Sequence, residues 1–165
     1  MKKLVYILVV ILLISQNKII AQKNYNPIPL SEHPRPDFKR DNWKNLNGEW
    51  EFKFDQKNEG LKNEWYNGKT PFNEKIIVPF PWGSKLSGIE DKANIGWYKK
   101  SITVDSAWEN KKTYIVIGAS DWETSVWIDG VLLGKHKGGY VPFSFDISSH
   151  LKYGNQHQII IRVDD

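Results

Sequence analysis

The sequence predicts an all-β domain with the architecture of a β-sandwich or jelly roll. From Trp43 onward, apolar and polar residues alternate with period 2, which is the pattern of half-buried strands. Seven or eight short apolar runs are separated by turns that contain Gly, Pro, Asn and Asp. No stretch shows the 3.6-residue periodicity of a convincing amphipathic helix.

The first half of the domain supplies four expected strands. In residues 48–54, three aromatic side chains alternate with charged ones, so one face is aromatic and the other charged. Residues 76–78 form a short apolar run that ends at two prolines. Residues 98–104 follow, with Lys100 interrupting the apolar series. Residues 114–117 are apolar throughout, which predicts a strand buried on both faces.

The second half begins with a predicted hairpin. Residues 125–128 and 131–133 flank Asp129-Gly130, and an Asp-Gly pair between apolar runs is typical of a two-residue turn, because both turn residues must accept positive φ. Residues 143–145 and 157–163 are the remaining expected strands. Single helical turns are expected at 61–66 and at 147–151, the latter with Asp146 as a weak cap.

The N-terminus has the layout of a secretory signal peptide, expected at residues 1–21. Lys2 and Lys3 precede 11 consecutive apolar residues, and cleavage is expected after Ala21. A membrane span needs about 20 apolar residues, so export without a membrane partner is expected, with an uncleaved anchor as the alternative. Residues 22–36 contain four prolines and predict an extended arm, and residues 37–165 form the expected domain.

Length, charge and cysteine content exclude several classes of protein. The 165 residues are too few for a (β/α)₈ barrel, which takes about 250. The absence of Cys excludes disulfide scaffolds, thiolate zinc sites and cysteine nucleophiles. The net charge of +4 falls to +1 without the leader, and no run of five basic residues occurs, so no nucleic-acid partner is expected.

Catalytic and metal-binding motifs are also missing from the sequence. The four histidines lack the spacing of a zinc site, and neither a G-x-S-x-G elbow nor a phosphate-binding loop occurs. We therefore expect no catalytic residue, no metal and no cofactor. A serine–histidine–acid triad stays possible, because its members converge only in space.

Carboxylates and tryptophans give the best candidates for ligand contacts. Asp121 and Glu123 flank Trp122, and two carboxylates beside an indole can hydrogen-bond sugar hydroxyls; the alternative is a solvated strand start whose Trp packs inward. Trp82 and Trp97 lie near loops and offer flat apolar faces to a sugar, or else they plug the ends of the sandwich. Trp50 and Trp127 alternate with polar neighbours and are expected in the core.

Four segments together resemble one family. Residues 43–52 resemble an L-N-G-x-W-x-F opening, 78–82 a V-P-x-x-W segment, and 96–100 an x-W-Y-R/K-R/K strand. Residues 119–147 are the most specific part, resembling V-W-x-N/D-G-x-x-x-G-x-H-x-G-G-Y-x-P-F-x-F-D-I. In this order and spacing the motifs resemble the N-terminal sugar-binding domain of family 2 glycoside hydrolases, the β-galactosidases, β-glucuronidases and β-mannosidases.

The resemblance implies a galactose-binding-domain-like jelly roll that is not itself catalytic. In the family, two glutamates in a separate barrel domain hydrolyse O-glycosyl bonds in carbohydrate metabolism. An acid near the end of this domain reaches the barrel's active site, which points to Asp164 or Asp165, and Asn94 is a further sugar-facing candidate. A carbohydrate ligand and a barrel partner outside this chain are thus implied, and the domain is expected to be truncated at its C-terminal end.

Two alternatives remain open from the sequence. In the first, the chain is a free-standing exported carbohydrate-binding module whose ligand surface consists of Trp82, Trp97, Trp122 and Tyr140. In the second, the domain has a purely structural role and docks on a partner barrel through apolar loops.

Overall fold

A computed structural model describes residues 28–33, 35, 37 and 40–165. The expected signal peptide, residues 1–21, lies outside the described residues, and so does much of the expected arm. The described part of the arm contacts the domain. Asn45 Nδ2 donates to the Leu30 carbonyl at 2.9 Å, and Asn47 Nδ2 donates to the Pro29 carbonyl at 3.0 Å.

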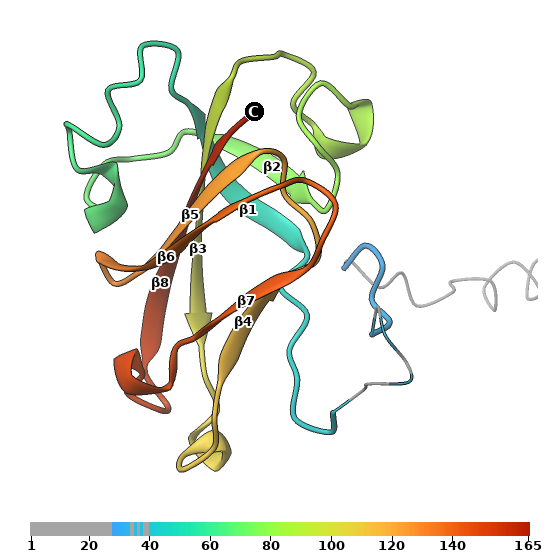
Figure 1. Cartoon of the computed structure of the whole chain (residues 1–165), viewed down its shortest axis with the longest axis vertical. Helices are drawn as coiled ribbons and strands as arrows, with labels where there is room; N and C mark the ends of the chain where they lie inside the picture. The colour runs from blue at the N-terminus through green and yellow to red at the C-terminus, as the bar shows by residue number, and fades with distance from the viewer. Residues whose placement is uncertain (1–27, 34, 36, 38–39) are drawn as a thin grey trace, which may run out of the picture.

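Two antiparallel sheets form the domain (Figure 1). The larger has six strands in the order β2-β1-β3-β8-β5-β6, and the smaller pairs β4 with β7. The strands are β1 Gly48–Phe54, β2 Glu74–Val78, β3 Ile95–Thr103, β4 Tyr114–Ile117, β5 Glu123–Ile128, β6 Val131–Lys137, β7 Phe143–Asp146 and β8 Gln156–Asp164. The expected all-β class is thereby confirmed, and the paired antiparallel sheets are consistent with a jelly-roll sandwich.

Only short 3₁₀ turns occur between the strands of the described region. They are η2 Trp65–Asn67, η3 Lys85–Ser87, η4 Ser106–Trp108 and η5 Ser148–His150. η5 lies within the expected turn at 147–151, whereas η2 overlaps only the end of the expected turn at 61–66 and extends one residue beyond it. Asp146 acts as expected near the last, because its Oδ1 accepts the Ser148 N–H at 2.9 Å. Within the described ranges, no helix is long and apolar enough to cross a membrane.

Apolar side chains bury both faces of the large sheet. Between the two sheets, Phe52 and Trp50 pack with Ile115 of the small sheet and with Ile128. On the opposite face, the long connection 55–73, seen at the upper left of Figure 1, covers a second cluster centred on stacked Trp97 and Trp127. Trp50 and Trp127 are buried, as the alternation predicted.

The expectation that residues 114–117 are buried on both faces is wrong. Ile115 is buried, but Tyr114 is 53% exposed and Val116 is 67% exposed. β4 belongs to the two-stranded sheet, which packs one face on the core and turns the other to solvent. An apolar run four residues long does not distinguish these two situations.

The predicted hairpin is confirmed. Asp129 and Gly130 have φ of 47° and 82°, and Ile128 pairs directly with Val131. These positive values are those of a two-residue turn that follows the twist of its strands. The hairpin places β6 at the edge of the large sheet and leaves β5 beside β8.

Candidate functional site

Two hollows lie at the end of the large sheet where β3 begins and β8 ends. There Ile95 pairs with Asp164, and the next residue, Asp165, donates its N–H to the Asn94 carbonyl at 2.8 Å. This bond holds the loop before β3 against the last residues of β8. Asn94 and Asp165 are both exposed, so their side chains are accessible at this end of the domain.

The first, which we call the Asn94 hollow, has a volume of about 430 Å³. Its lining residues are Trp82, Lys92, Ala93, Asn94 and Asp165. The half-buried Trp82 ring packs against Phe52 and Tyr98, with centroid distances of 5.9 and 6.1 Å. Trp82 therefore plugs the end of the sandwich and also borders the hollow, and its contact with a sugar stays a prediction.

The second, the Asp164 hollow, has a volume of about 520 Å³ and shares Lys92, Ala93 and Asn94 with the first. Its other lining residues are Asp55, Gln56, Asn58, Ile95 and Asp164. Successive residues of an extended chain point to opposite sides. Accordingly, Asp164 borders only this hollow and Asp165 borders only the Asn94 hollow.

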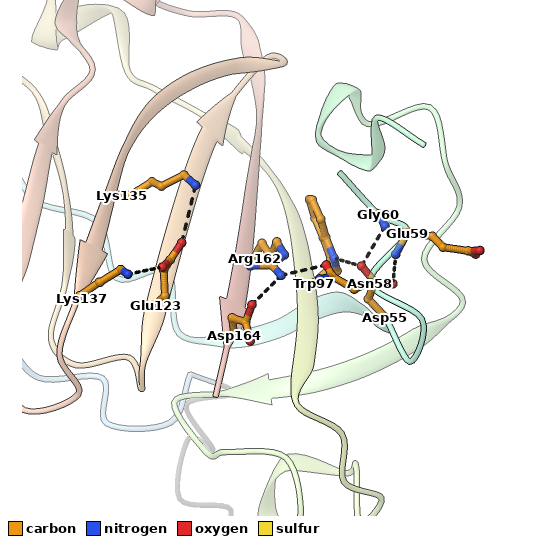
Figure 2. A network of polar contacts seen from close by, with 10 residues as sticks. All are labelled: Asp55, Asn58, Glu59, Gly60, Trp97, Glu123, Lys135, Lys137, Arg162 and Asp164. Atoms are coloured by element: carbon orange, nitrogen blue, oxygen red, sulfur yellow. Dashed lines mark hydrogen bonds and ion pairs between the residues drawn. The ribbon is translucent and has the colours of Figure 1, made fainter. Parts of the chain in front are cut away.

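The two neighbouring acids also differ in their partners. Arg162, two residues earlier on the same face of β8, donates from Nη2 to Asp164 Oδ2 at 2.7 Å and to Asn58 Oδ1 at 3.1 Å (Figure 2). The Arg162 side chain is only 5% exposed, so Asp164 balances a buried charge. No hydrogen bond or ion pair of the Asp165 carboxylate occurs among the described residues, which leaves it available to a ligand.

Asp165 has an electrostatic effect on the core behind it. Burial, followed by the smaller effect of the Asp165 carboxylate, raises the pKa of Tyr98 far above its usual value. Tyr98 is thereby held even more firmly in the neutral form that an ordinary tyrosine has at physiological pH. The Tyr98 ring packs edge-on against Trp50 and Phe52, and it also contacts the Trp82 ring in a tilted arrangement.

The expectation that Trp97 faces a sugar is wrong. Its ring is 0% exposed, lies between Trp65 and Trp127, and donates Nε1–H to Asp55 Oδ2 at 3.1 Å. Asp55 also accepts the N–H groups of Glu59 and Gly60, as Figure 2 shows. Trp97 lies within β3 rather than on a loop, so the alternative interpretation, a structural role, applies.

The three candidates Asp121, Trp122 and Glu123 do not act alike. Lys137 and Lys135 lie 2.9 and 3.6 Å from the Glu123 carboxylate, and the Lys137 hydrogen bond is the main cause of a lowered pKa at that carboxyl. The Glu123 carboxylate is therefore already paired with two lysines of the neighbouring strand β6. Asp121 and Trp122 are exposed, which contradicts the inward-packing alternative for Trp122.

Tyr140 lies in the loop after β6 and is the most exposed large apolar residue of the described region. Its loop is anchored beside Trp122, because Gly138 donates its N–H to the Trp122 carbonyl at 2.9 Å. Trp122 in turn donates its N–H to the Asp164 carbonyl at 3.2 Å. The start of β5, and through it the loop that carries Tyr140, is thus attached to the end of β8 beside Asp165.

Sequence reasoning missed three residues at this end. Arg162 donates to both Asp164 and Asn58, and Lys92 borders both hollows. Arg162 and Asp164 are two apart on a strand and share a face, a spacing that was available in the sequence. Lys92 and Asn58 lie on loops, where the sequence carries no such signal. Among the residues that the structure describes, no group of three or more His, Cys, Asp or Glu side chains is placed to hold a metal ion.

The fold and the two hollows define a β-sandwich domain with a polar site at one end. Residues 43–164 match the family described as glycosyl hydrolases family 2, sugar binding domain. The match covers well over half of the chain and includes all eight strands. The chain belongs to this family, as the sequence motifs indicated.

Curated relatives agree with this assignment. A β-glucuronidase of Paenibacillus borealis is 29% identical over 126 residues, which cover 74% of this chain and 21% of the relative. A β-galactosidase of Thermoanaerobacter pseudethanolicus is 41% identical over 76 residues, which cover 46% and 10%. The chain thus spans about a fifth or less of the length of these relatives.

Solved structures give the same result. A β-glucuronidase from Ruminococcus gnavus, determined with a C6-substituted uronic isofagomine, matches with a TM-score of 0.66 and 28% identity, covering 73% of this chain and 21% of that one. A Lactobacillus rhamnosus β-glucuronidase matches with a TM-score of 0.63 and 28% identity. The domain is homologous to the N-terminal part of these enzymes.

Proposed function

We propose that this chain is the non-catalytic sugar-binding domain of an exported, family 2-like glycoside hydrolase of the β-galactosidase type. The observation that carries the proposal is the pairing of Asn94 with Asp165 at the mouth of the Asn94 hollow. The family match supports a carbohydrate ligand.

The chemistry of the Asn94 hollow suits a sugar. A carboxylate accepts hydrogen bonds from hydroxyl groups, and a side-chain amide both donates and accepts. The indole of Trp82 adds an apolar surface for sugar C–H groups. Of the two acids that the sequence left open, we favour Asp165, because Asp164 already balances Arg162.

Hydrolysis itself is proposed to take place outside this chain. The resemblance places two catalytic glutamates in a separate barrel domain, and the match takes in only about a fifth or less of the length of the β-glucuronidase and β-galactosidase relatives. In this proposal the Asn94 hollow faces the barrel's active site and completes the pocket for a β-glycoside. Export is proposed from the basic start and apolar run of residues 1–21.

A titration tests the sugar-binding role. Purified chain is titrated with methyl β-D-galactoside and methyl β-D-glucuronide while Trp fluorescence and backbone NMR shifts are followed. We expect spectral shifts near Trp82 and Ala93. Asn94→Ala or Asp165→Asn is expected to weaken the affinity for the sugar about tenfold, since a hydrogen bond to a charged group contributes about 1.5 kcal/mol or more. Asn155→Ala, an exposed asparagine in the turn before β8, is the matched control.

Two results contradict the proposal. One is the absence of any shift at millimolar sugar in chain that is folded. The other concerns catalysis: the pure chain is expected not to hydrolyse aryl β-glycosides, so turnover that a single carboxylate substitution abolishes shows that the domain is itself an enzyme.

A further inference from the structure

Two exposed aromatic side chains lie at the start of β5 and in the loop that is attached to it. We define the aromatic rim as Asp121, Trp122 and Tyr140. Trp122 is 54% exposed and Tyr140 is 94% exposed, whereas most of the large aromatic side chains in the described region are buried or half-buried. Exposed apolar groups that cluster beside polar ones mark binding surfaces.

The parts of the rim are fixed relative to each other. Gly138 donates its N–H to the Trp122 carbonyl at 2.9 Å, which attaches the loop that carries Tyr140 to the start of β5. Gly139 lies so close to Asp121 that a Cβ atom there would come within 2.6 Å of the Asp121 Cγ atom. Only glycine allows this approach, so the loop and the Asp121 side chain are packed together.

The carboxylate of Asp121 has no hydrogen-bond or ion-pair partner among the described residues. Glu123, two residues later, differs from Asp121 because two lysines neutralise its carboxylate. A free carboxylate accepts several hydroxyl hydrogen bonds, and the flanking rings offer faces to C–H groups. Protein–protein interface cores are depleted in Asp, so this combination fits a polyhydroxylated ligand better than an apolar protein surface.

The rim is continuous with the hollows. Trp122 donates its N–H to the Asp164 carbonyl, and the paired residues Glu123, Asp164 and Ile95 form one row across β5, β8 and β3. Neither Trp122 nor Tyr140 is among the lining residues of the two hollows. The rim is therefore a separate surface next to the hollows, attached to them through Asp164.

We propose that the aromatic rim is a second carbohydrate subsite, which binds a further sugar unit of a glycan whose end lies in the Asn94 hollow. The inference rests on the proposed function and adds the class of ligand to it. The ligand is an oligosaccharide chain, and a glycoside with a small aglycone occupies only part of the surface.

Calorimetric titration of the 165-residue chain compares methyl β-D-galactoside with β-1,4-galactotetraose. We expect the tetrasaccharide to bind about fivefold more tightly than the methyl glycoside, because a stacked aromatic contact contributes about 1 kcal/mol. Trp122→Ala, Tyr140→Ala and Asp121→Ala are each expected to reduce this difference and to leave methyl glycoside binding unchanged. Trp122→Phe keeps a ring and is expected to retain most of the difference.

Tyr114→Ala is the matched control, because Tyr114 is an exposed aromatic residue on the small sheet, away from the rim. This variant is expected to bind both ligands as the parent chain does. Equal affinity of the parent chain for the two ligands overturns the second subsite and leaves the proposed function standing. Failure of both ligands to bind overturns both proposals.

Two further outcomes overturn the subsite in favour of other roles. If Trp122→Ala weakens both ligands equally, the ring acts on the first sugar unit and no second subsite exists. If sedimentation shows a dimer that Trp122→Ala disrupts while tetrasaccharide affinity is unchanged, the rim instead binds a second copy of this chain.

Discussion

The Nδ1 atom of buried His157 lies 2.6 Å from Asp129 Oδ2, and this contact joins the start of β8 to the turn of the β5–β6 hairpin. The other Asp129 oxygen accepts the Gln158 N–H at 2.7 Å. Asp129 thus serves the hairpin turn and the sheet together. The Asp-Gly pair was visible in the sequence, but this second role depends on a partner 28 residues away.

Asp129→Asn tests the contact without disturbing the turn, since Asn also accepts positive φ. We expect a loss of about 1–2 kcal/mol in the free energy of unfolding, because the His157 contact loses its charge. Urea denaturation followed by Trp fluorescence measures it. Asp129→Ala removes both hydrogen bonds and the preference for positive φ in the turn, so it is expected to lower the free energy of unfolding further. Equal stability of all three chains contradicts the role assigned to Asp129.

Asp146 gives a prediction about pH. The Ser148 hydrogen bonds, and next the Lys112 ammonium, lower the pKa of Asp146 from 3.8 to about 2. A carboxyl with a lowered pKa stabilises the fold fully above its unfolded-state pKa, and this contribution is lost as pH falls through the folded-state value. The contribution is therefore expected to be complete above about pH 4 and to disappear between pH 4 and pH 2.

The measurement compares the parent chain with Asp146→Asn by urea denaturation at several pH values. The difference in unfolding free energy is expected to be constant above pH 5 and to shrink below pH 4. Asp105→Asn is a control for acid effects at another exposed turn, where the carboxylate accepts the Ala107 N–H. A difference that grows as the solution is acidified contradicts the assigned direction.

Asp55 joins the connection 55–73 to the Trp97 cluster, and removal of its carboxylate is expected to lower the free energy of unfolding. Its buried carboxylate accepts three hydrogen bonds, one from the Trp97 indole and two from the N–H groups of Glu59 and Gly60. Asp55→Ala leaves these donors unsatisfied, so we expect a loss of about 3 kcal/mol in unfolding free energy and a shift in Trp emission. Gln56→Ala, at the exposed next position, is expected to change neither.

How much of the molecule the sequence predicts depends on the range of the interactions. Local patterns predicted the Trp50 strand and the Asp129-Gly130 turn, because alternation and turn chemistry act between neighbours. The sequence missed the burial of Trp97, because the covering connection 55–73 shows no local signal of its docking. Likewise, the choice between Asp164 and Asp165 requires knowing which face of β8 each occupies.

The site itself is predicted only in part by the same logic. Asn94 was expected from the family motif, and it lies at the mouth of a hollow. Lys92, which borders both hollows, lies two residues earlier in a loop without periodicity. The lysine pairs that neutralise Glu123 come from the neighbouring strand β6, so only the strand register determines that Glu123 is engaged and Asp121 is free.

Gly96 links the core to the Asn94 hollow and gives the last prediction. A Cβ atom at this position would come within 2.6 Å of the Trp82 ring and 3.0 Å of the Phe52 ring. Gly96→Ala must therefore displace Trp82, the aromatic wall of the hollow. We expect a loss of about 1–3 kcal/mol in unfolding free energy, as for overpacked cores, together with weaker binding of methyl β-D-galactoside.

Gly118→Ala is the matched control, since an added Cβ there meets nothing within 4 Å. Comparing the two variants separates displacement of Trp82 from the general effect of replacing a glycine by alanine. If Gly96→Ala lowers stability but leaves sugar affinity unchanged, Trp82 only plugs the sandwich. If both quantities fall together while Gly118→Ala alters neither, the same indole closes the core and forms a wall of the sugar site.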